Sequence, residues 1–254
     1  MRKSHPFNPL ERLLDVREAA EFLNVSEMTV RRWTNQGTLR CYRVGGKRER
    51  RFRLEDIQQY LAGWTGQKES IRVDLGFGGF AVPDGGHITH LYSDPAEAMD
   101  SGVSYIRKGL DNGETVLLVA RPDRMKDLVE MLWRGDCKVE DFRSRGKLRL
   151  SEGMESPADQ LEFISRICSS ADGRFRLLGD MLWTRAKGWT LEALRSLEEA
   201  ASSGAAVAGK LFLCQYPLDD ISGREAMMAL ETHTHAITGG ALRESPYFRP
   251  PRRT

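Results

Sequence analysis

Short apolar segments recur along the chain from residue 87 onward, and each is followed by a segment with helical spacing. The apolar segments read HITHLY (87–92), ETVLLVA (114–120), FRLLGDM (175–181) and KLFLCQY (210–216). Strands without polar alternation are buried on both faces, which is typical of parallel sheets covered by helices on either side. This feature predicts a three-layer α/β domain with a mostly parallel sheet.

The intervening and following segments complete this prediction. Pro95 suits the first turn of a helix that runs from Asp94 to about Leu110. Further helices are expected at 122–133, 157–169, 191–201 and 223–236, and a short strand at 148–151. The C-terminal stretch ITGGALRESPYFRPPRRT predicts one edge strand at most and a tail at 251–254.

Charge is distributed unevenly over the 254 residues. Residues 1–66 contain 13 Lys and Arg against 8 Asp and Glu, a local net charge of +5, whereas residues 67–254 contain 25 against 28, a net charge of −3. A basic segment joined to a mildly acidic body suggests a nucleic-acid partner for the N-terminal part. We therefore expect a DNA-binding domain at 1–64, a linker at 65–85 and the α/β domain at 86–250.

The sequence carries no sign of a membrane span, a signal peptide or paired cysteines. No apolar run approaches the roughly 18 residues of a membrane helix, and the N-terminal segment lacks the apolar core of a signal peptide. The four cysteines are scattered with no C-x-x-C pair, which favours reduced structural cysteines over disulfides or a zinc ribbon. These features predict a cytoplasmic protein without a membrane partner.

Two helical patterns separated by a short break occupy residues 15–36. A D-x-x-E pattern starts the first helix, and Ser26 is placed to cap the second. Val30 and Trp33 are expected to face inward on the second helix. The residues left to reach base edges in a major groove are Ser26, Glu27, Met28, Thr29, Arg31 and Arg32.

Residues 39–61 follow with a strand, a Gly45-Gly46 turn, a second strand and a short helix from about Leu54 to Leu61. The basic residues around this hairpin are Arg43, Lys47, Arg48, Arg50 and Arg51. Such a hairpin is suited to form a wing that contacts the sugar–phosphate backbone. The order of these elements resembles the winged helix-turn-helix domain of MerR-type and excisionase-type regulators, which implies double-stranded DNA as a partner.

The segment after Leu61 departs from the MerR-type pattern. Those regulators usually continue into a long dimerisation helix, whereas this chain continues with AGWTGQKESIRVDLGFGGFAVPDGG, which is rich in Gly and polar residues and has no sustained apolar period. A single small domain makes few base contacts, so we expect a homodimer whose contacts lie outside this segment.

The turn, strand and helix at 108–128 have the layout in which nucleotide-binding proteins place a phosphate loop. A phosphate loop requires glycines, a lysine and a Ser or Thr hydroxyl. Here Pro122 removes a backbone donor and Asp123 would repel a phosphate. ATP hydrolysis is not expected at this position, and because no catalytic triad or paired carboxylates stand out, neither is another enzyme activity.

Short motifs occur in the order HITHLY, GLDNGE, GDMLW, RSLEEA, LCQY and HAITGGALRESPYF across residues 85–250. In this order they resemble the MEDS sensory domain of methanogen and methylotroph signalling proteins, a relative of the RecA/KaiC-type ATPase core without its phosphate loop. The resemblance implies a DNA-binding transcription regulator whose C-terminal domain senses a small organic molecule or a cellular signal. It does not identify the ligand.

Ligands of open α/β sheets bind beyond the carboxyl ends of the strands. The candidates at such ends are Tyr92, Arg121, Asp180, Trp183, Gln215 and Tyr216. A buried carboxylate at Asp180 would need a partner, either a ligand donor or Arg121, and in the second case the pair would only order a loop. Trp183 and Tyr216 are candidates for an apolar ligand wall, with core positions as the alternative.

The five histidines do not show metal-ligand spacing. His87 and His90 would lie on opposite faces of a strand, and His233 and His235 about half a turn apart on a helix. We therefore expect structural histidines, no metal and no cofactor. Two alternatives for the body stay open: a protein-interaction module that captures a signalling partner, and a residual nucleotide-binding module.

Overall fold

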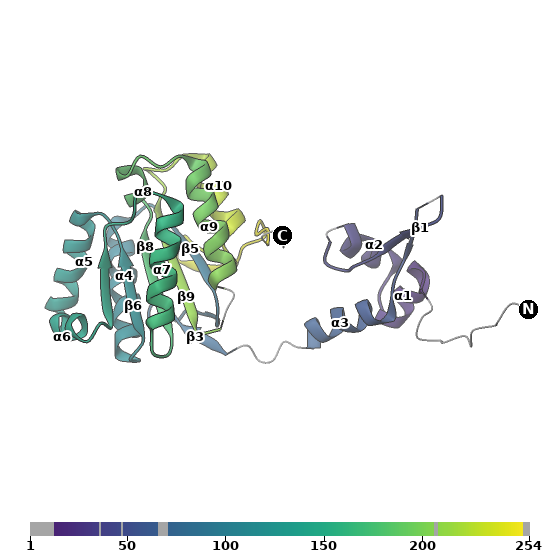
Figure 1. Ribbon diagram of the computed structural model, residues 1–254, viewed down its shortest axis with the longest axis horizontal. Helices are drawn as coiled ribbons and strands as arrows, with labels where there is room; N and C mark the ends of the chain where they lie inside the picture. The colour runs from purple at the N-terminus through teal and green to yellow at the C-terminus, as the bar shows by residue number, and fades with distance from the viewer. Residues whose placement is uncertain (1–12, 36, 47, 66–70, 206–207, 251–254) are drawn as a thin grey trace, which may run out of the picture. The chain divides into compact units, whose positions relative to one another are not determined.

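The computed structural model describes residues 13–35, 37–46, 48–65, 71–205 and 208–250, and it divides the chain into two compact units at residue 70 (Figure 1). Lys47 and the tail at 251–254 lie outside the described residues. Among the residues that are described, none of the helices combines the length and hydropathy that a membrane span requires.

In the described residues of the N-terminal unit, three helices accompany a two-stranded antiparallel hairpin. Its elements are α1 (Val16–Leu23), α2 (Glu27–Asn35), β1 (Tyr42–Val44), β2 (Glu49–Arg51) and α3 (Leu54–Thr65). The expected start of α1 is confirmed as a capping box, in which Asp15 accepts from the backbone N–H of Glu18 and the Glu18 side chain accepts from that of Asp15. A core of Val16, Ala19, Ala20, Val30, Leu39, Phe52 and Ile57 holds the unit together.

The second unit is built on a seven-stranded sheet with the order β11-β10-β5-β9-β8-β6-β7. Its strands are β5 (His87–Tyr92), β6 (Thr115–Val119), β7 (Leu148–Ser151), β8 (Phe175–Asp180), β9 (Lys210–Pro217), β10 (His235–Thr238) and β11 (Ala241–Glu244). Every neighbouring pair is parallel except β10 with β11. The mostly parallel sheet expected from the unbroken apolar segments is confirmed.

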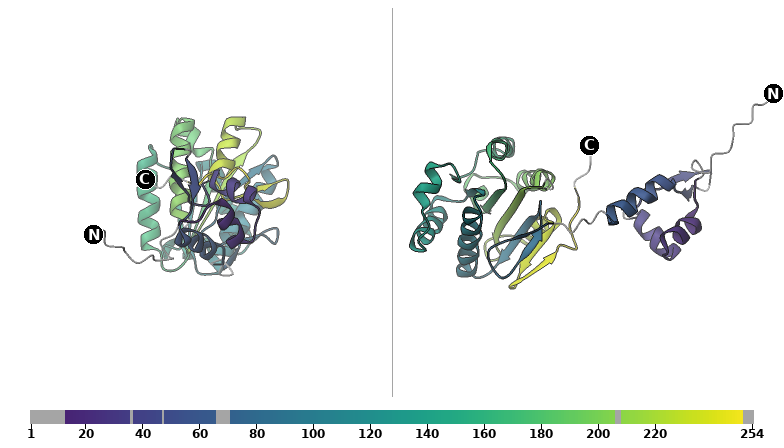
Figure 2. Two further views of the ribbon diagram at one scale, coloured as in Figure 1. Left: turned by 90° about the vertical axis from the view of Figure 1, so that its right-hand side faces the viewer. Right: turned by 90° about the horizontal axis from the view of Figure 1, so that it is seen from below.

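Helices cover both faces of this sheet (Figures 1 and 2). The helices are α4 (Pro95–Asp111), α5 (Pro122–Arg134), α6 (Val139–Ser144), α7 (Pro157–Ser170), α8 (Trp183–Ala186), α9 (Leu191–Ala205) and α10 (Gly223–Thr232). One buried cluster joins α4 and α5 to one face, and a second joins α7, α9 and α10 to the other. Alternate residues of a strand therefore belong to different cores: Val116 and Leu118 face α4 and α5, whereas Leu117 and Val119 face α7.

The C-terminal part of the sheet differs from the prediction. Helix α10 ends at Thr232, and two strands follow where a longer helix and one edge strand at most were expected. The backbone N–H of Thr234 donates to the carbonyl oxygen of His87 at 2.9 Å, and β10 continues alongside β5. This tertiary pairing overrides the helical spacing of the sequence, which contains no local breaker before His235.

The expected linker at 65–85 was too long. A hairpin of β3 (Arg72–Asp74) and β4 (Ala81–Pro83) lies within it. Val73, Leu75 and Val82 of this hairpin are buried in the core that α4 and β6 share. The hairpin therefore belongs to the second unit, and only short apolar stretches between glycines signal it in the sequence.

A buried ion pair joins this hairpin to the sheet. The guanidinium of Arg176 on β8 is fully buried, lies against Glu114, and donates to the carbonyl oxygen of Asp74 at 2.9 Å. It also lies 4.9 Å from the ring centroid of Tyr105. Removing one partner of a buried pair leaves the other charge without compensation.

Replacing Arg176 with Ala is expected to lower the free energy of unfolding by up to about 3–5 kcal/mol, because Glu114 would stay buried with only the longer contact to Arg174, at 3.6 Å, as compensation. Urea denaturation of the full chain measures the change. Arg134→Ala, which removes an exposed pair with Glu130, is the matched control and should change stability by no more than about 1 kcal/mol. Equal losses of unfolding free energy in both variants would contradict the prediction that the buried pair contributes more than the exposed pair.

Candidate functional site

Helix α2 presents the face that was expected to meet DNA. The backbone N–H of Thr29 donates to Ser26 Oγ at 3.2 Å, which confirms Ser26 as the cap. Val30 is buried in the core of the unit, whereas Met28 is 75% exposed. Glu27, Arg31 and Arg32 are also exposed, and Arg31 pairs with Glu27 at 3.3 Å. The sequence prediction of an outward polar face on this helix therefore agrees with the structure.

The hairpin of β1 and β2 places its arginines beside that helix. Arg43 and Arg50 are directly opposed in the register. A groove of about 490 Å³ lies between the hairpin, the start of α1 and the first turns of α2. Its charged lining residues are Arg17, Arg31, Arg43, Arg48, Arg50, Arg51, Asp15, Glu27 and Glu49. Arginines outnumber carboxylates in this groove, as a surface for phosphates requires.

The wing arginines are not equivalent. Arg50 donates to Asn35 Oδ1 at 2.6 Å and so ties the wing to the end of α2, and Arg51 pairs with Glu49 at 2.7 Å. Arg43 and Arg48 are exposed and form no ion pair among the described residues. Arg43 and Arg48 are therefore the better candidates for phosphate contacts, while Arg50 has a positioning role that the sequence did not indicate.

The candidate ligand residues of the second unit do not form one site. Gln215 faces α4, where its Nε2 donates to the carbonyl oxygen of Ala98 at 2.8 Å. Tyr216 faces the other way, and its hydroxyl donates to Glu198 on α9. Trp183 packs in the core on the same side as Tyr216. The expectation of a single cluster was wrong because neighbouring residues of a strand point to opposite faces of the sheet.

The expected partnership of Asp180 and Arg121 is present. Arg121 Nε lies 3.4 Å from Asp180 Oδ2, and the Asp180 side chain is 2% exposed. Burial raises the pKa of Asp180, and the charges of Arg121 and Arg124 offset part of this rise. Tyr92, at the end of β5, has its own pKa raised by burial and by the charge of Asp180. Tyr92, Asp180 and Arg121 therefore share one polar region at the carboxyl ends of the strands.

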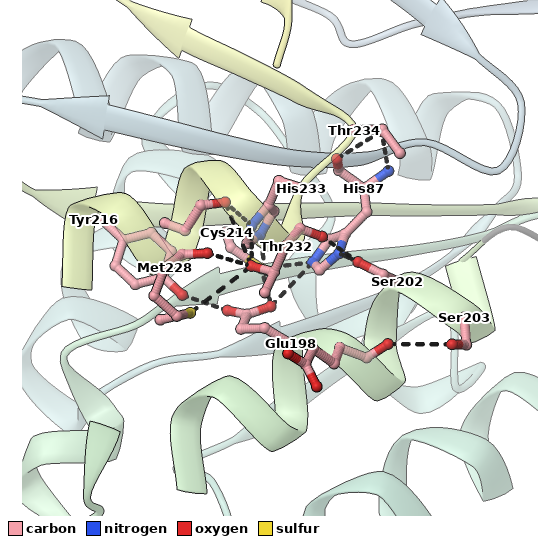
Figure 3. Close-up of polar contacts among 12 residues, drawn as sticks. His87, Glu198, Ser202, Ser203, Cys214, Tyr216, Met228, Thr232, His233 and Thr234 are labelled. Atoms are coloured by element: carbon pink, nitrogen blue, oxygen red, sulfur yellow. Dashed lines mark hydrogen bonds and ion pairs between the residues drawn. The ribbon is translucent and has the colours of Figure 1, made fainter. Parts of the chain in front are cut away.

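Four buried side chains converge on the opposite face of the sheet: His87 from β5, Glu198 from α9, Cys214 from β9 and His233 after α10 (Figure 3). Glu198 Oε2 lies 3.2 Å from His87 Nε2 and 3.5 Å from His233 Nε2. Cys214 Sγ lies 3.5 Å from His87 Nε2 and 3.9 Å from Glu198 Oε2. We call these residues the His-Glu-Cys centre.

Hydrogen bonds outside the centre fix the orientation of both imidazoles. His87 Nδ1 lies 2.9 Å from Ser202 Oγ, and His233 Nδ1 donates to the carbonyl oxygen of Ala229 at 2.7 Å. Burial lowers the pKa of His87 to about 3, and burial together with His87 lowers the pKa of His233 to about 3. Both rings are therefore neutral at pH 7 and direct Nε2 into the centre.

The donor types in the centre, two imidazole nitrogens, a carboxylate and a thiol, are those that bind transition metals. No metal was expected from the sequence, because the histidines that are close in sequence lack ligand spacing and the spacing around His233 and His235 predicted a single helix. The structure places His233 after that helix and brings it to His87 instead. The signal available in the sequence was indirect, since Glu198 and Cys214 lie in two of the motifs that carry the MEDS resemblance.

Comparisons with known proteins agree with this architecture. The family model for the MEDS domain, described as methanogen/methylotroph, DcmR sensory domain, matches residues 86–234, and a helix-turn-helix domain model matches residues 13–65. The chain is 30% identical over 242 residues to the transcriptional repressor DcmR of Methylorubrum extorquens (strain DSM 6343 / CIP 106787 / DM4), covering 88% of this chain and 90% of that protein. The chain belongs to the DcmR-type family of regulators with a MEDS sensory domain. It is a DNA-binding transcription regulator.

The fold of the sensory domain also has a neighbour among solved structures. A KaiC-like protein from Pyrococcus horikoshii OT3 aligns with a TM-score of 0.50 and 17% identity, covering 65% of this chain and 78% of that one. The predicted RecA/KaiC-like fold is thereby confirmed. The expected phosphate-loop position is occupied by the start of α5, where Arg121 is the N-cap and Pro122 the first helical residue.

Substitutions in the N-terminal unit should distinguish side chains that contact bases from side chains that contact phosphates. Arg31→Ala or Arg32→Ala is expected to reduce discrimination between cognate and mismatched sites by about 1–3 kcal/mol. Arg48→Ala should weaken binding to every sequence and reduce the slope of log K against log salt by about 1, because it removes a phosphate contact. Fluorescence anisotropy at several salt concentrations measures both effects, with Arg134→Ala as control. An unchanged salt slope for Arg48→Ala would contradict the wing assignment.

Asp180→Asn tests the ionisation of the buried carboxyl. Because the pKa of Asp180 is raised in the folded state, its contribution to stability is complete below the unfolded pKa and is lost as pH rises through the folded value. Asn resembles the protonated form, so the variant should gain stability relative to the native chain as pH rises from 4 to about 7. Thermal melts across this range provide the measurement. A variant that loses relative stability with rising pH would show that the Arg121 pair outweighs burial.

Proposed function

We propose that this regulator binds operator DNA as a homodimer and that its MEDS domain senses a small organic molecule that changes operator affinity. One observation carries the sensing step. A cavity of about 30 Å³ lies between the sheet and α7 and α9, lined by apolar groups that include Leu177, Met181 and Trp183. A cavity needs about 10–15 Å³ by the same measure to hold one water molecule, so only a very small compound fits here without rearrangement.

The lining of the cavity indicates which compounds suit it. Apolar side chains form most of the wall, and Gln160, His87 and Glu198 supply polar groups. This combination favours a one-carbon compound with one polar or polarisable group. Trp183, which we predicted as part of an apolar wall, lines this cavity, whereas Tyr216 supports Glu198 from the side.

The polar region on the other face is a second position at which the same or another ligand would bind. Gln215 Oε1 is buried there without a hydrogen-bond partner among the described residues, as are Nε and Nη2 of Arg124, and His90 Nε2 lies 3.6 Å from Glu97 Oε1. Unpaired buried groups are costly, and a ligand that pairs them gains affinity. Tyr92, Arg121, Asp180 and Gln215 are the proposed contacts of such a ligand.

Coupling to DNA requires two states of the regulator with different ligand affinities. A homodimer presents two copies of α2, and a ligand that prefers one arrangement of the sensory domains would change how well both copies reach their half-sites. The related protein DcmR is a transcriptional repressor, so repression that a ligand relieves is the form that we propose.

The test measures binding of the full-length protein to its own upstream DNA, with and without methanol, dichloromethane and an extract of small metabolites. We expect one of these additions to change the apparent Kd by about 5–150-fold. Gly179→Ala should abolish the response without loss of DNA binding, because Gly179 lines the cavity and an added methyl meets only Met181 Sδ closely, at 3.0 Å.

Gly204→Ala in α9 is the matched control, since an added methyl there meets nothing within 4 Å. It should keep the full response. If the response persists in Gly179→Ala, the ligand would instead bind in the polar region around Gln215. If no addition changes specific DNA binding, and the MEDS domain retains another protein, the results would favour partner capture instead.

A further inference from the structure

We propose that the His-Glu-Cys centre binds a divalent transition-metal ion of the zinc type through His87 Nε2, His233 Nε2, a Glu198 carboxylate oxygen and Cys214 Sγ. These four atoms lie within 4.8 Å of one another, and all four residues are buried. They come from four separate elements, so only the folded domain assembles them (Figure 3).

The distances between the donor atoms match a tetrahedral site. Zinc lies about 2.0–2.2 Å from nitrogen or oxygen ligands and about 2.3 Å from sulfur, so the edges of a regular tetrahedron are roughly 3.3–3.6 Å. The observed separations are 3.2 Å from Glu198 to His87, 3.5 Å from Glu198 to His233, 3.5 Å from Cys214 to His87 and 3.9 Å from Cys214 to Glu198. The remaining two separations, from His233 Nε2 to His87 Nε2 and to Cys214 Sγ, are within 4.8 Å, so an ion at the middle requires side-chain shifts of about an ångström or less.

The hydrogen-bond directions leave lone pairs that point inward. The Ser202 hydroxyl donates to the carbonyl oxygen of Thr232, so it must accept from His87 Nδ1–H. Each imidazole therefore carries its proton on Nδ1 and a lone pair on Nε2. His233 Nε2 has no hydrogen-bond partner among the described residues. Two lone pairs and a carboxylate oxygen facing one another repel unless a cation lies between them.

The surroundings resemble the outer sphere of a metal site. Metal-binding histidines usually donate their second N–H to a carbonyl, a carboxylate or another oxygen, as His233 does to Ala229 and His87 to Ser202. The Tyr216 hydroxyl donates to Glu198 Oε1 and leaves Oε2 for the ion. A divalent cation also balances a carboxylate and a thiolate, which explains how Glu198 can be buried without an arginine or lysine partner at this site. Nitrogen and sulfur donors favour zinc, cobalt or iron(II) over magnesium and calcium.

The position of the centre suggests a role for the ion, and this step rests on the proposed function. The cavity of about 30 Å³ is lined by His87, Glu198 and Cys214. A small molecule in the cavity would therefore lie against the ion, and a polarisable or oxygen-bearing compound could become an additional ligand. Metal binding itself requires neither DNA nor a metabolite, so it can be tested independently.

The first experiment determines the metal content of full-length protein purified without a histidine tag. Elemental analysis should find about one zinc-type ion per chain, and removal by a chelator should lower the melting temperature, with recovery on addition of Zn²⁺ alone. X-ray absorption of the zinc-loaded native chain should show one sulfur ligand among nitrogen and oxygen ligands. A folded protein that binds no Zn²⁺, or a zinc site without sulfur, would overturn the proposal.

Variants of the outer sphere test the same site with little risk to folding. Ser202→Ala should weaken Zn²⁺ binding by about 10–100-fold, because His87 Nδ1 loses its acceptor. Ser203→Ala is the matched control: its hydroxyl bonds to the carbonyl oxygen of Glu199 on the exposed side of the same helix, and Zn²⁺ affinity should not change. Equal affinities of the two variants in competition titrations would exclude the centre as the binding site.

Cobalt substitution identifies the thiolate ligand. The Co²⁺-loaded native chain should show the near-ultraviolet absorption of a cobalt–thiolate bond, and Cys214→Ser should lose this band, whereas Cys168→Ser should retain it. Should Cys214→Ser fail to fold, the band should persist in Cys41→Ser, Cys137→Ser and Cys168→Ser, which leaves Cys214 as the thiolate ligand; loss of the band in any one of these variants would reject the centre. A band that persists in folded Cys214→Ser would assign the thiolate to another cysteine and reject the centre.

Discussion

The parallel pairing of β5 with β9 on one side and β10 on the other is the constraint on which the sensory domain depends. It fixes His87 at the start of β5, beside Phe212 in the register of β9, and it brings the chain after α10 back to the carbonyl oxygen of His87. Because β10 must pair with β5, helix α10 cannot continue through His233, and the His233 side chain is directed toward the sheet. The His-Glu-Cys centre is thus a consequence of strand order, and Glu198 reaches it because α9 packs across the same strands.

The sheet then divides the functional groups of the domain between two environments. On the side of α4 and α5, charged groups such as Asp180 and Arg121 lie near the carboxyl ends of the strands, with Arg121 still about one-third exposed. On the side of α7, α9 and α10, the centre and the adjoining cavity are enclosed by apolar residues such as Trp183. An ion pair with one partly exposed partner tolerates many changes, whereas a closed polar centre requires every lone pair to be matched. This difference is why the enclosed side carries the stronger inference.

The DNA-binding head depends on a much smaller core and on local signals. Its capping box at the start of α1, its left-handed Asn24 at the end of α1 and its cap at Ser26 are short-range features, and the sequence alone identified the capping box, the Ser26 cap and the helices that they start. The helix that was expected to end at Leu61 continues to Thr65. The different roles of the wing arginines could not be predicted, because the hydrogen bond from Arg50 to Asn35 joins residues that are far apart in the sequence.

The sequence by itself determined the two-domain plan, the helix-turn-helix, the mostly parallel sheet and the family, because each follows from short periodic patterns or from motifs in a fixed order. The pairing of Asp180 with Arg121 was also foreseeable, since the carboxyl ends of parallel strands meet at one edge. Tertiary structure alone decided three things: the hairpin at 72–83, the two strands after α10, and the meeting of His87, Glu198, Cys214 and His233. The physical reason is the same in each case. Packing and strand pairing between distant segments outweighed local propensity, and contacts such as that of His87 with Cys214 or of Asp74 with Arg176 leave no periodic trace in a single sequence.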